Sequence, residues 1–217
     1  RPSILDIYPN LPDHIDALIN WRAPTFGSPM GGPIRIDRAM SERKIAEELF
    51  LRDTLVFHGS VVAVDGEAYL FTAKSGTGKS THTRLWRELL GERAVMVNDD
   101  KPFLKLTEAG VLACGSPWSG KHGLDTNITV PLQGICILQR GQENRIWSIT
   151  GAEASEILLH QAQPPVDPEG YPAFAALVEE LLGRGPLWKM ECTKDLEAAK
   201  TAYRAMCPKK QQTEDSV

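Results

Sequence analysis

The sequence predicts an α/β domain with a mixed β-sheet and flanking helices, and three observations support this fold class. Two strand-like runs in HGSVVAVDGEAYLFTA (58–73) flank Asp65 and Gly66, which indicates a β-hairpin because glycine supplies the positive φ of a tight turn. The second run leads directly into a Gly-rich turn and then a helical stretch. Farther along the chain, apolar strand-like runs alternate with amphipathic helical runs, without an internal repeat.

The length of 217 residues fits one domain with a sizeable core. Residues 1–40 are rich in proline and predict an irregular segment, for which a surface loop and a functional lid are both open interpretations. Residues 41–207 carry the periodic runs and predict the single domain. Residues 208–217 are polar and predict a frayed tail.

The elements expected inside the domain follow from local patterns. The first is a helix over SERKIAEELFLR (41–52), with Ser41 and Glu42 suited to its amino terminus. A helix over 81–91 ends at a glycine, and RAVMVNDDKPFLKL (93–106) predicts a buried strand that emerges at two carboxylates. Further strands are expected over 129–140 and 185–193, and further amphipathic helices over 153–162, 172–182 and 195–206.

Composition narrows the classes of partner. The chain has 24 basic and 28 acidic residues and a net charge of -4, so no basic excess indicates a nucleic-acid or membrane-surface partner. No apolar run is long enough to span a bilayer. The four cysteines are far apart and form no CxxC pair, which indicates thiols in a reducing compartment and favours the cytoplasm.

The stretch TAKSGTGKST (72–81) has the chemistry of a phosphate-binding loop. The amino terminus of a helix attracts an anion, and Gly76 and Gly78 allow the backbone to wrap around it. Lys79 would reach the β- and γ-phosphates of a nucleotide, and Ser80 would ligate Mg²⁺. The alternative is a chance Gly-rich turn, but the strand before the loop and the helix after it favour a nucleotide site. The residues expected to bind the nucleotide are Ser75, Gly76, Thr77, Gly78, Lys79, Ser80 and Thr81.

A second candidate feature is the run MVNDD (96–100), in which an apolar strand ends at Asp99 and Asp100. One carboxylate can hold Mg²⁺, directly or through water, and the other can take a proton from an attacking hydroxyl. Two solvated acids at a strand end are the alternative. Their position about twenty residues after the phosphate loop favours the site.

His58 begins the predicted hairpin. The start of the first strand of a hairpin lies beside the end of the second, so we expect His58 near the phosphate loop. There its imidazole could bond a carboxylate or a phosphate oxygen near neutral pH. A purely structural histidine is the alternative.

Candidates for the acceptor site lie in GSPWSGKHGLDTN (115–127), where Trp118, Lys121 and His122 stand in a Gly-rich segment. The strand that ends at Asp100 and the strand before Arg140 should both end at the edge where the nucleotide binds, so the connection between them starts at that edge. We therefore expect the loop to border the acceptor site. Arg140 could neutralise the charge of a transferring phosphoryl group or could be a solvated residue at the end of a strand.

Taken together, a hairpin that starts with HG, an SGxGKS loop and a strand ending in DD resemble the catalytic domain of HPr kinase/phosphorylase. The loop also resembles that of ATP-dependent phosphoenolpyruvate carboxykinase, whose fold is related. The resemblance covers roughly residues 55–105, and the closing pattern LWKMECTKDLEAAKTAY is also similar to the end of such proteins. It implies a P-loop kinase-like domain with a mixed sheet.

The resemblance also implies roles for individual residues. His58 matches the active-site histidine of the family, Lys79 its phosphate-binding lysine and Ser80 its Mg²⁺ ligand. Asp99 and Asp100 match its acid pair, with Asp99 as the expected metal ligand and Asp100 as the expected proton acceptor.

The chain also departs from the family pattern. Ala73 stands where the strict loop pattern has its first glycine, and PWSGKHG (117–123) stands where the family has a glutamate-containing signature. Residues 1–40 also predict no counterpart of the separate amino-terminal domain of the full-length bacterial enzyme. Because of these departures, the resemblance does not extend to a prediction that HPr is the substrate or that the reverse phosphorolysis reaction occurs.

The function that these features favour is a Mg²⁺-dependent kinase that transfers the γ-phosphate of ATP to a hydroxyl on a peptide, a protein or a small molecule. Two alternatives stay open. A carboxykinase-like enzyme would act on a carboxylated metabolite through Lys121, His122 and Arg140, and a nucleotide-sensing module would bind without turnover. Relatives of this family are often oligomers, so a homo-oligomer is an open expectation.

Overall fold

The computed structural model describes residues 45–118, 120 and 123–207. Residues 45–50 are helical. After them the elements are, in chain order, β1 (Thr54–Val56), β2 (Ser60–Val64), β3 (Glu67–Thr72), α4 (Lys79–Leu90), η1 (Gly91–Arg93), β4 (Ala94–Asn98), β5 (Phe103–Thr107), β6 (Gly110–Cys114), β7 (Thr129–Arg140), β8 (Arg145–Ser148), α5 (Gly151–Gln161), η2 (Pro168–Gly170), α6 (Tyr171–Gly183), β9 (Leu187–Cys192) and α7 (Leu196–Met206).

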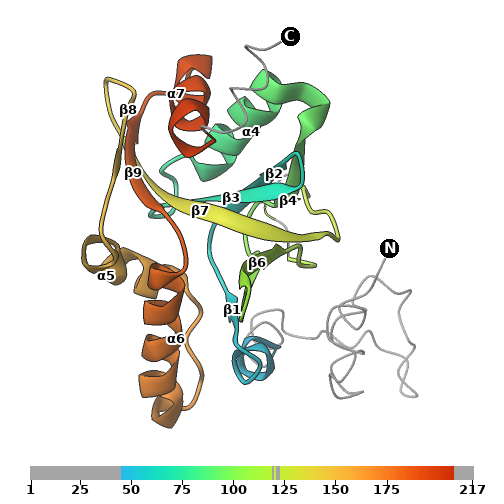
Figure 1. The fold of residues 1–217 in the computed structure, drawn as a ribbon, viewed down its shortest axis with the longest axis vertical. Helices are drawn as coiled ribbons and strands as arrows, with labels where there is room; N and C mark the ends of the chain where they lie inside the picture. The colour runs from blue at the N-terminus through green and yellow to red at the C-terminus, as the bar shows by residue number, and fades with distance from the viewer. Residues whose placement is uncertain (1–44, 119, 121–122, 208–217) are drawn as a thin grey trace, which may run out of the picture.

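The long strand β7 joins two parts of a mixed, nine-stranded sheet (Figure 1). Its first residues pair antiparallel with β6, which continues to β5 and β1. Its second half lies between β3 and β9 and runs parallel to both. The path β1-β5-β6-β7-β3-β2-β4 describes most of the sheet, and β9 and β8 extend it on the other side of β7. The predicted α/β class with a mixed sheet is therefore confirmed.

The predicted hairpin is formed by β2 and β3, which pair antiparallel around a turn in which Asp65 and Gly66 have φ of 50° and 81°. Because β4 is antiparallel to β2, strands β3, β4, β7 and β9 all end at the same edge of the sheet. The chain enters β2 at that edge as well. We call it the carboxyl edge, and it carries the candidate site.

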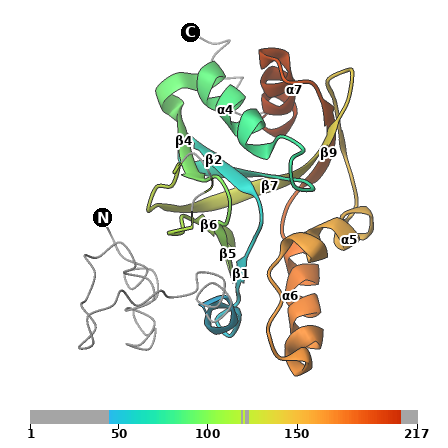
Figure 2. The ribbon, with the colours of Figure 1, turned by 180° about the vertical axis from the view of Figure 1, so that it is seen from behind.

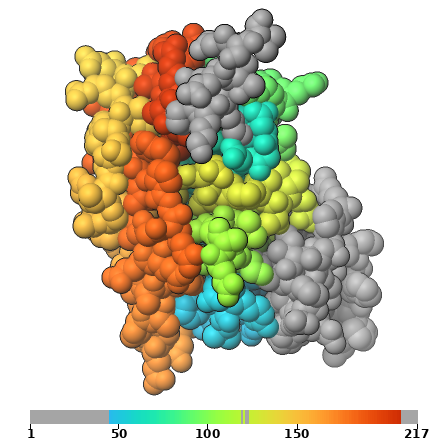
Figure 3. All heavy atoms as spheres, viewed as in Figure 1, coloured from blue at the N-terminus to red at the C-terminus, as the bar shows by residue number. Residues whose placement is uncertain are grey.

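Two layers of helices cover the sheet, because alternate strand residues face opposite sides. Val62, Tyr69 and Phe71 pack with Trp86 of α4 and Tyr203 of α7 in one cluster. Their sequence neighbours on the same strands face a second cluster, which α5 and α6 close. Figure 2 shows these two pairs of helices at opposite ends of the view, with the sheet between them. On the face shown in Figure 3, the orange-to-red segments α6, β9 and α7 form a continuous band along one side.

Most of the expected elements are present within a few residues of their predicted ends: β7, β9, α4, α5, α6 and α7. The single strand predicted over 93–106 is wrong, because the chain turns at the acid pair and forms β4 and β5 instead. The helix expected over 41–52 is described only from residue 45. The predicted irregular segment 1–40 and the polar tail 208–217 lie outside the described residues, so both stay predictions.

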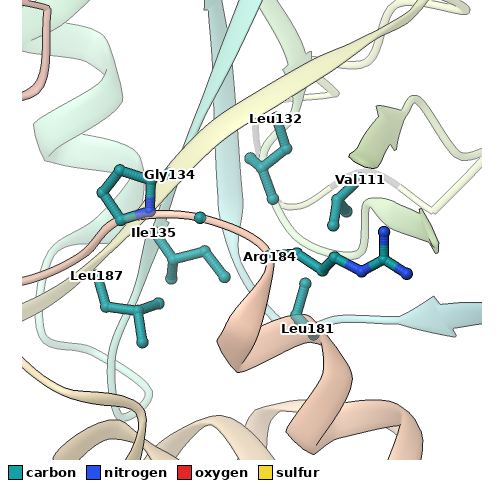
Figure 4. Close-up of a pocket in the computed structure, with 9 residues that line it drawn as sticks. Val111, Leu132, Gly134, Ile135, Leu181, Arg184 and Leu187 are labelled. Carbon is teal, nitrogen blue, oxygen red and sulfur yellow. The ribbon is translucent and has the colours of Figure 1, made fainter. Parts of the chain in front are cut away.

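A small, partly open cavity lies between β7 and the end of α6 (Figure 4). Its volume of about 10 Å³ holds about one water molecule, so it cannot accept a nucleotide. An open groove of about 430 Å³ runs beside Ala94–Met96 of β4 and is lined on its other side by Gly123–Thr126. None of the described helices has the length and hydrophobicity that a bilayer crossing requires.

His82 makes the packing of α4 against the sheet sensitive to acid. Its ring is 2% exposed, lies 4.6 Å from the ring of Phe71, and accepts a hydrogen bond at Nε2 from Trp86 Nε1. Burial lowers the pKa of His82 from 6.5 to about 3, because the charged ring would lose its water. The unfolded chain therefore binds one more proton than the folded chain between these two values, and stability falls as the pH falls below 6.5.

Replacing His82 by Gln should remove this acid sensitivity. With a folded pKa near 3, the wild-type protein loses about 2 kcal/mol of stability through His82 between pH 8 and pH 5, whereas His82→Gln keeps that amount. Urea unfolding at the two pH values measures the difference. His160→Gln on the exposed side of α5 is the matched control and should behave like the wild type. Equal pH dependence of the wild type and His82→Gln would contradict the assignment.

Candidate active site

The phosphate loop connects β3 to α4 at the carboxyl edge of the sheet. Gly76 and Gly78 have φ of 77° and 125°, which side chains rarely adopt, so both positions need glycine. A Cβ added at either glycine would meet no described atom within 4 Å, so the space around them is open. Helix α4 begins at Lys79, and no described side chain caps its first N–H groups. These groups are therefore available to an anion.

Lys79 lies under the loop. It is 8% exposed, and its Nζ donates a hydrogen bond to the carbonyl of Ala73 at 3.1 Å. Burial lowers the pKa of Lys79, and the nearby charge of Asp100 opposes that shift. The ammonium group is thus poorly hydrated beside a loop with open N–H groups, and an anion in the loop would stabilise its charge.

Arg140 approaches the same loop from the end of β7. Its guanidinium donates a hydrogen bond to the carbonyl of Gly76. The structure thus brings this predicted residue to the phosphate loop, 64 residues away in the sequence. It adds a cation at the rim of the loop, where the side chain stays exposed.

His58 and Asp100 face each other where β2 begins and β4 ends. His58 Nε2 lies 3.9 Å from Asp100 Oδ1, and each side chain is about one-third exposed. The backbone fixes this approach, because the N–H of Gly59 donates to the carbonyl of Asp100 at 3.0 Å. The sequence predicted that His58 lies near the phosphate loop, where it could bond a carboxylate, and the structure brings its ring to Asp100.

The two carboxylates of the acid pair have different environments. Asp99 is 4% exposed and accepts a hydrogen bond at Oδ1 from the N–H of Gly120 at 2.6 Å. A Cβ at Gly120 would lie 3.1 Å from both carboxylate oxygens, so glycine allows this close approach. Asp100 is the more accessible of the two acids and is the one that meets His58.

Asn98 holds the turn that presents the acid pair, and the sequence analysis missed it. Its fully buried side chain accepts hydrogen bonds from the N–H groups of Asp100 and Lys101 at 2.9 and 2.7 Å. Its Nδ2 donates to the carbonyls of Ser116 and Trp118 and to the hydroxyl of Ser116. Asn98 therefore ties the turn after β4 to the segment after β6. The asparagine before two aspartates is the local signal, since such side chains often bond the backbone two or three residues on.

Asn98→Ala should destabilise the protein by about 3 kcal/mol or more, because it leaves several buried N–H and C=O groups without partners. Asn127→Ala is the control, because Asn127 is only half-buried. Its cost should stay within about 0.5 kcal/mol. Chemical denaturation of both variants gives the comparison. A loss below about 1 kcal/mol for Asn98→Ala would contradict a central role for Asn98 in the turn.

The other side of His58 contacts α5. The ring Nδ1 lies 2.8 Å from Oε1 of Gln161, and the N–H of His58 donates to the carbonyl of Gln161 at 2.7 Å. Burial and the charge of Lys79 lower the pKa of His58, while Gln161 and Asp100 oppose the shift. His58 is therefore neutral at pH 7. No local pattern in the sequence identifies Gln161, because its partner is 103 residues away.

The acceptor residues predicted in the loop 115–127 have different outcomes. Trp118 is 3% exposed and belongs to an apolar cluster, where its ring lies 5.7 Å from that of Phe103. The ring is thus buried in the core and does not face an open site. Lys121 and His122 lie outside the described residues, and their expected contact with the acceptor stays a prediction.

The expected Mg²⁺ ligands fit a site that nucleotide phosphates complete. Within the described residues there is no group of three or more His, Cys, Asp or Glu side chains that could hold a metal alone. Mg²⁺ is commonly held by one or two protein oxygens together with nucleotide phosphates and water. Ser80, in the first turn of α4, and Asp99, after β4, remain the expected protein ligands.

Comparisons with known proteins find similarity among solved structures. Among solved structures, the chain is similar to the HPr(Ser) kinase/phosphatase from Coxiella burnetii, at 10% sequence identity and a TM-score of 0.41. The alignment covers 74% of this chain and 98% of that one. No family model matches the sequence, and the search of curated proteins finds no match.

Proposed function

We propose that this protein is a Mg²⁺- and ATP-dependent P-loop kinase that transfers the γ-phosphate to a hydroxyl acceptor. The observation that carries the proposal is the convergence of three groups at the carboxyl edge. An open Gly-rich loop leads into α4, the buried Lys79 lies beneath it, and Asp100 lies close enough to oppose the shift in the lysine pKa. A phosphate-binding loop with a carboxylate nearby has the parts that phosphoryl transfer requires.

Each residue of the proposed site has a physical task. The N–H groups of the loop 75–80 and the ammonium group of Lys79 would bind the phosphates. Arg140 would add positive charge at the rim, once an incoming phosphate competes for the hydrogen bond that the guanidinium now makes to Gly76. A bound Mg²⁺ ion would offset the negative charge of the phosphates, with Ser80 and Asp99 as its protein ligands.

Asp100 would accept the proton of the attacking hydroxyl. The charge of Asp100 is close to Lys79 and to His58, as the pKa shifts of both residues indicate. A hydroxyl that donates to Asp100 would therefore lie close to the end of the phosphate chain. This placement supports a peptide, a protein or a small molecule with an exposed hydroxyl as the acceptor, and it does not separate these three.

The test is phosphoryl transfer from γ-labelled ATP to a panel of acceptors: a serine peptide, a threonine peptide, a sugar alcohol, a carboxylated metabolite and water. The proposal predicts label on a hydroxyl acceptor, with ADP formed in equal amount. Transfer to the carboxylated metabolite alone would favour a carboxykinase-like enzyme. Tight ATP binding without transfer to any acceptor would favour a nucleotide-sensing module and contradict the kinase proposal.

A further inference from the structure

Hydrogen bonds to other segments hold both the ring and the backbone of His58 at the carboxyl edge of the sheet. Gln161 is the last residue of α5, and it bonds both the ring and the backbone N–H of His58. The carbonyl of His58 accepts a third bond from the hydroxyl of Thr72, at 3.0 Å. The adjacent Phe57 and Ala162 form a β-bridge that fastens α5 to this strand. The position of the His58 ring is therefore fixed from two directions.

The bond to Gln161 determines which ring nitrogen carries the proton. The atom that faces Nδ1 is the amide oxygen Oε1 at 2.8 Å, and an amide oxygen can only accept a hydrogen bond. Nδ1 must therefore carry the proton of the neutral ring. Nε2 is then the nitrogen with the lone pair, and it faces Asp100 Oδ1 at 3.9 Å. Two acceptors without a shared proton do not bond each other directly, which agrees with this distance.

We propose that Gln161 is a positioning residue that holds His58 in its Nδ1–H form, so that Nε2 is the proton acceptor beside Asp100. This inference rests on the proposed kinase function for its catalytic consequence. The O–H bond of the acceptor breaks as its proton moves to Asp100, its oxygen bonds the γ-phosphorus of ATP, and ADP leaves. That proton then passes to Nε2, which forms an imidazolium whose Nδ1–H still donates to Gln161. This transfer leaves Asp100 as a carboxylate again, and after the product leaves, the imidazolium returns the proton to solvent.

The surroundings of His58 support a neutral ring that can accept a proton. The groups that influence it are Lys79 from α4, Asp100 and Lys101 after β4, and Gln161 from α5. Burial and the two lysines lower its pKa, and Asp100 and Gln161 oppose them. A proton received from Asp100 would therefore be held only briefly, which suits a residue that must return it to solvent.

The first experiment measures the tautomer of His58 directly, in the protein without nucleotide. Long-range ¹H–¹⁵N NMR correlations distinguish a protonated ring nitrogen from an unprotonated one, and His58→Asn identifies the signal among the five histidines. The wild type should show a protonated Nδ1 and an unprotonated Nε2. In Gln161→Met the carboxylate of Asp100 becomes the strongest acceptor near the ring, so the proton should move to Nε2. Gln163→Met is the matched control and should leave the signal unchanged.

The second experiment uses Gln161→Glu, which keeps an acceptor at Nδ1 but adds a negative charge. The charge should raise the pKa of His58 by about one unit or more. The acidic limb of the pH–turnover profile should move upward by the same amount. Gln161→Met should lower kcat by about tenfold, with KM for ATP unchanged, because the proposed nucleotide site at residues 75–80 does not include Gln161.

Two NMR results would overturn the proposal: an Nε2-protonated ring in the wild type, as expected if the amide of Gln161 were turned around, or an unchanged tautomer in Gln161→Met. Both are independent of turnover. A protein that transfers no phosphate to any acceptor would overturn the kinase function, and the NMR signals would still decide whether Gln161 sets the tautomer.

Discussion

Lys79→Ala is expected to remove most of the stabilisation that MgATP gives the protein. A hydrogen bond to a charged group contributes roughly 1.5–3 kcal/mol, so loss of the ammonium group should weaken nucleotide binding by about a hundredfold. At a concentration of 100 times the wild-type Kd, the stabilisation would fall from about 2.7 to about 0.4 kcal/mol. Thermal unfolding with and without MgATP measures both values.

In the absence of nucleotide, Lys79→Ala should not lose stability relative to the wild type. Burial of Lys79 disfavours its charged form, so Lys79→Ala should leave the unliganded protein as stable as the wild type or slightly more stable. Lys74→Ala is the control, because Lys74 lies in the same loop but is exposed. It should retain the stabilisation by MgATP. Equal stabilisation of wild type and Lys79→Ala by MgATP would exclude Lys79 as the phosphate-binding lysine.

Asp100→Asn is expected to lower kcat by about 10²–10⁴-fold, the usual range for loss of a group that accepts a proton in the transition state. Nucleotide affinity should change little, because Asp100 would meet the acceptor hydroxyl and not the phosphates. The substitution also removes a charge that raises the pKa of His58, so this pKa should fall further below its ordinary value.

Asp99→Asn provides the contrast with Asp100→Asn. Asp99 is the expected metal ligand and accepts the N–H of Gly120, so its substitution should weaken the binding of MgATP. Steady-state kinetics that separate kcat from the KM for MgATP distinguish the two variants. If Asp100→Asn changed only KM and left kcat intact, Asp100 would not be the proton acceptor.

The sequence predicted the parts of the site that local chemistry determines. The Asp65–Gly66 turn fixes the hairpin, the glycines fix the loop, and the hairpin geometry alone places His58 near the loop. The strand that emerges at the acid pair was also expected, although the turn that ends it there was not. Asn98 accepts hydrogen bonds from the N–H groups of Asp100 and Lys101, and the chain turns there. The one expected strand is therefore two strands, β4 and β5.

The remaining features depend on contacts between distant segments, and no local pattern encodes them. Gln161 reaches His58 only because α5 docks beside the strand that precedes it. Trp118 stands in a loop rich in glycine and polar residues, yet its ring completes an apolar cluster with Phe103. A large ring in such a loop has the same local pattern whether it packs inward or faces a ligand.

The most direct test of the proposed site is the crystal structure of the protein with Mg²⁺ and a non-hydrolysable ATP analogue. We expect the β- and γ-phosphates to lie against the N–H groups of residues 76–80, in contact with Lys79, and the γ-phosphate to face the gap between His58 and Asp100. Phosphates bound elsewhere on the protein, or a γ-phosphate that points away from Asp100, would contradict the proposed site.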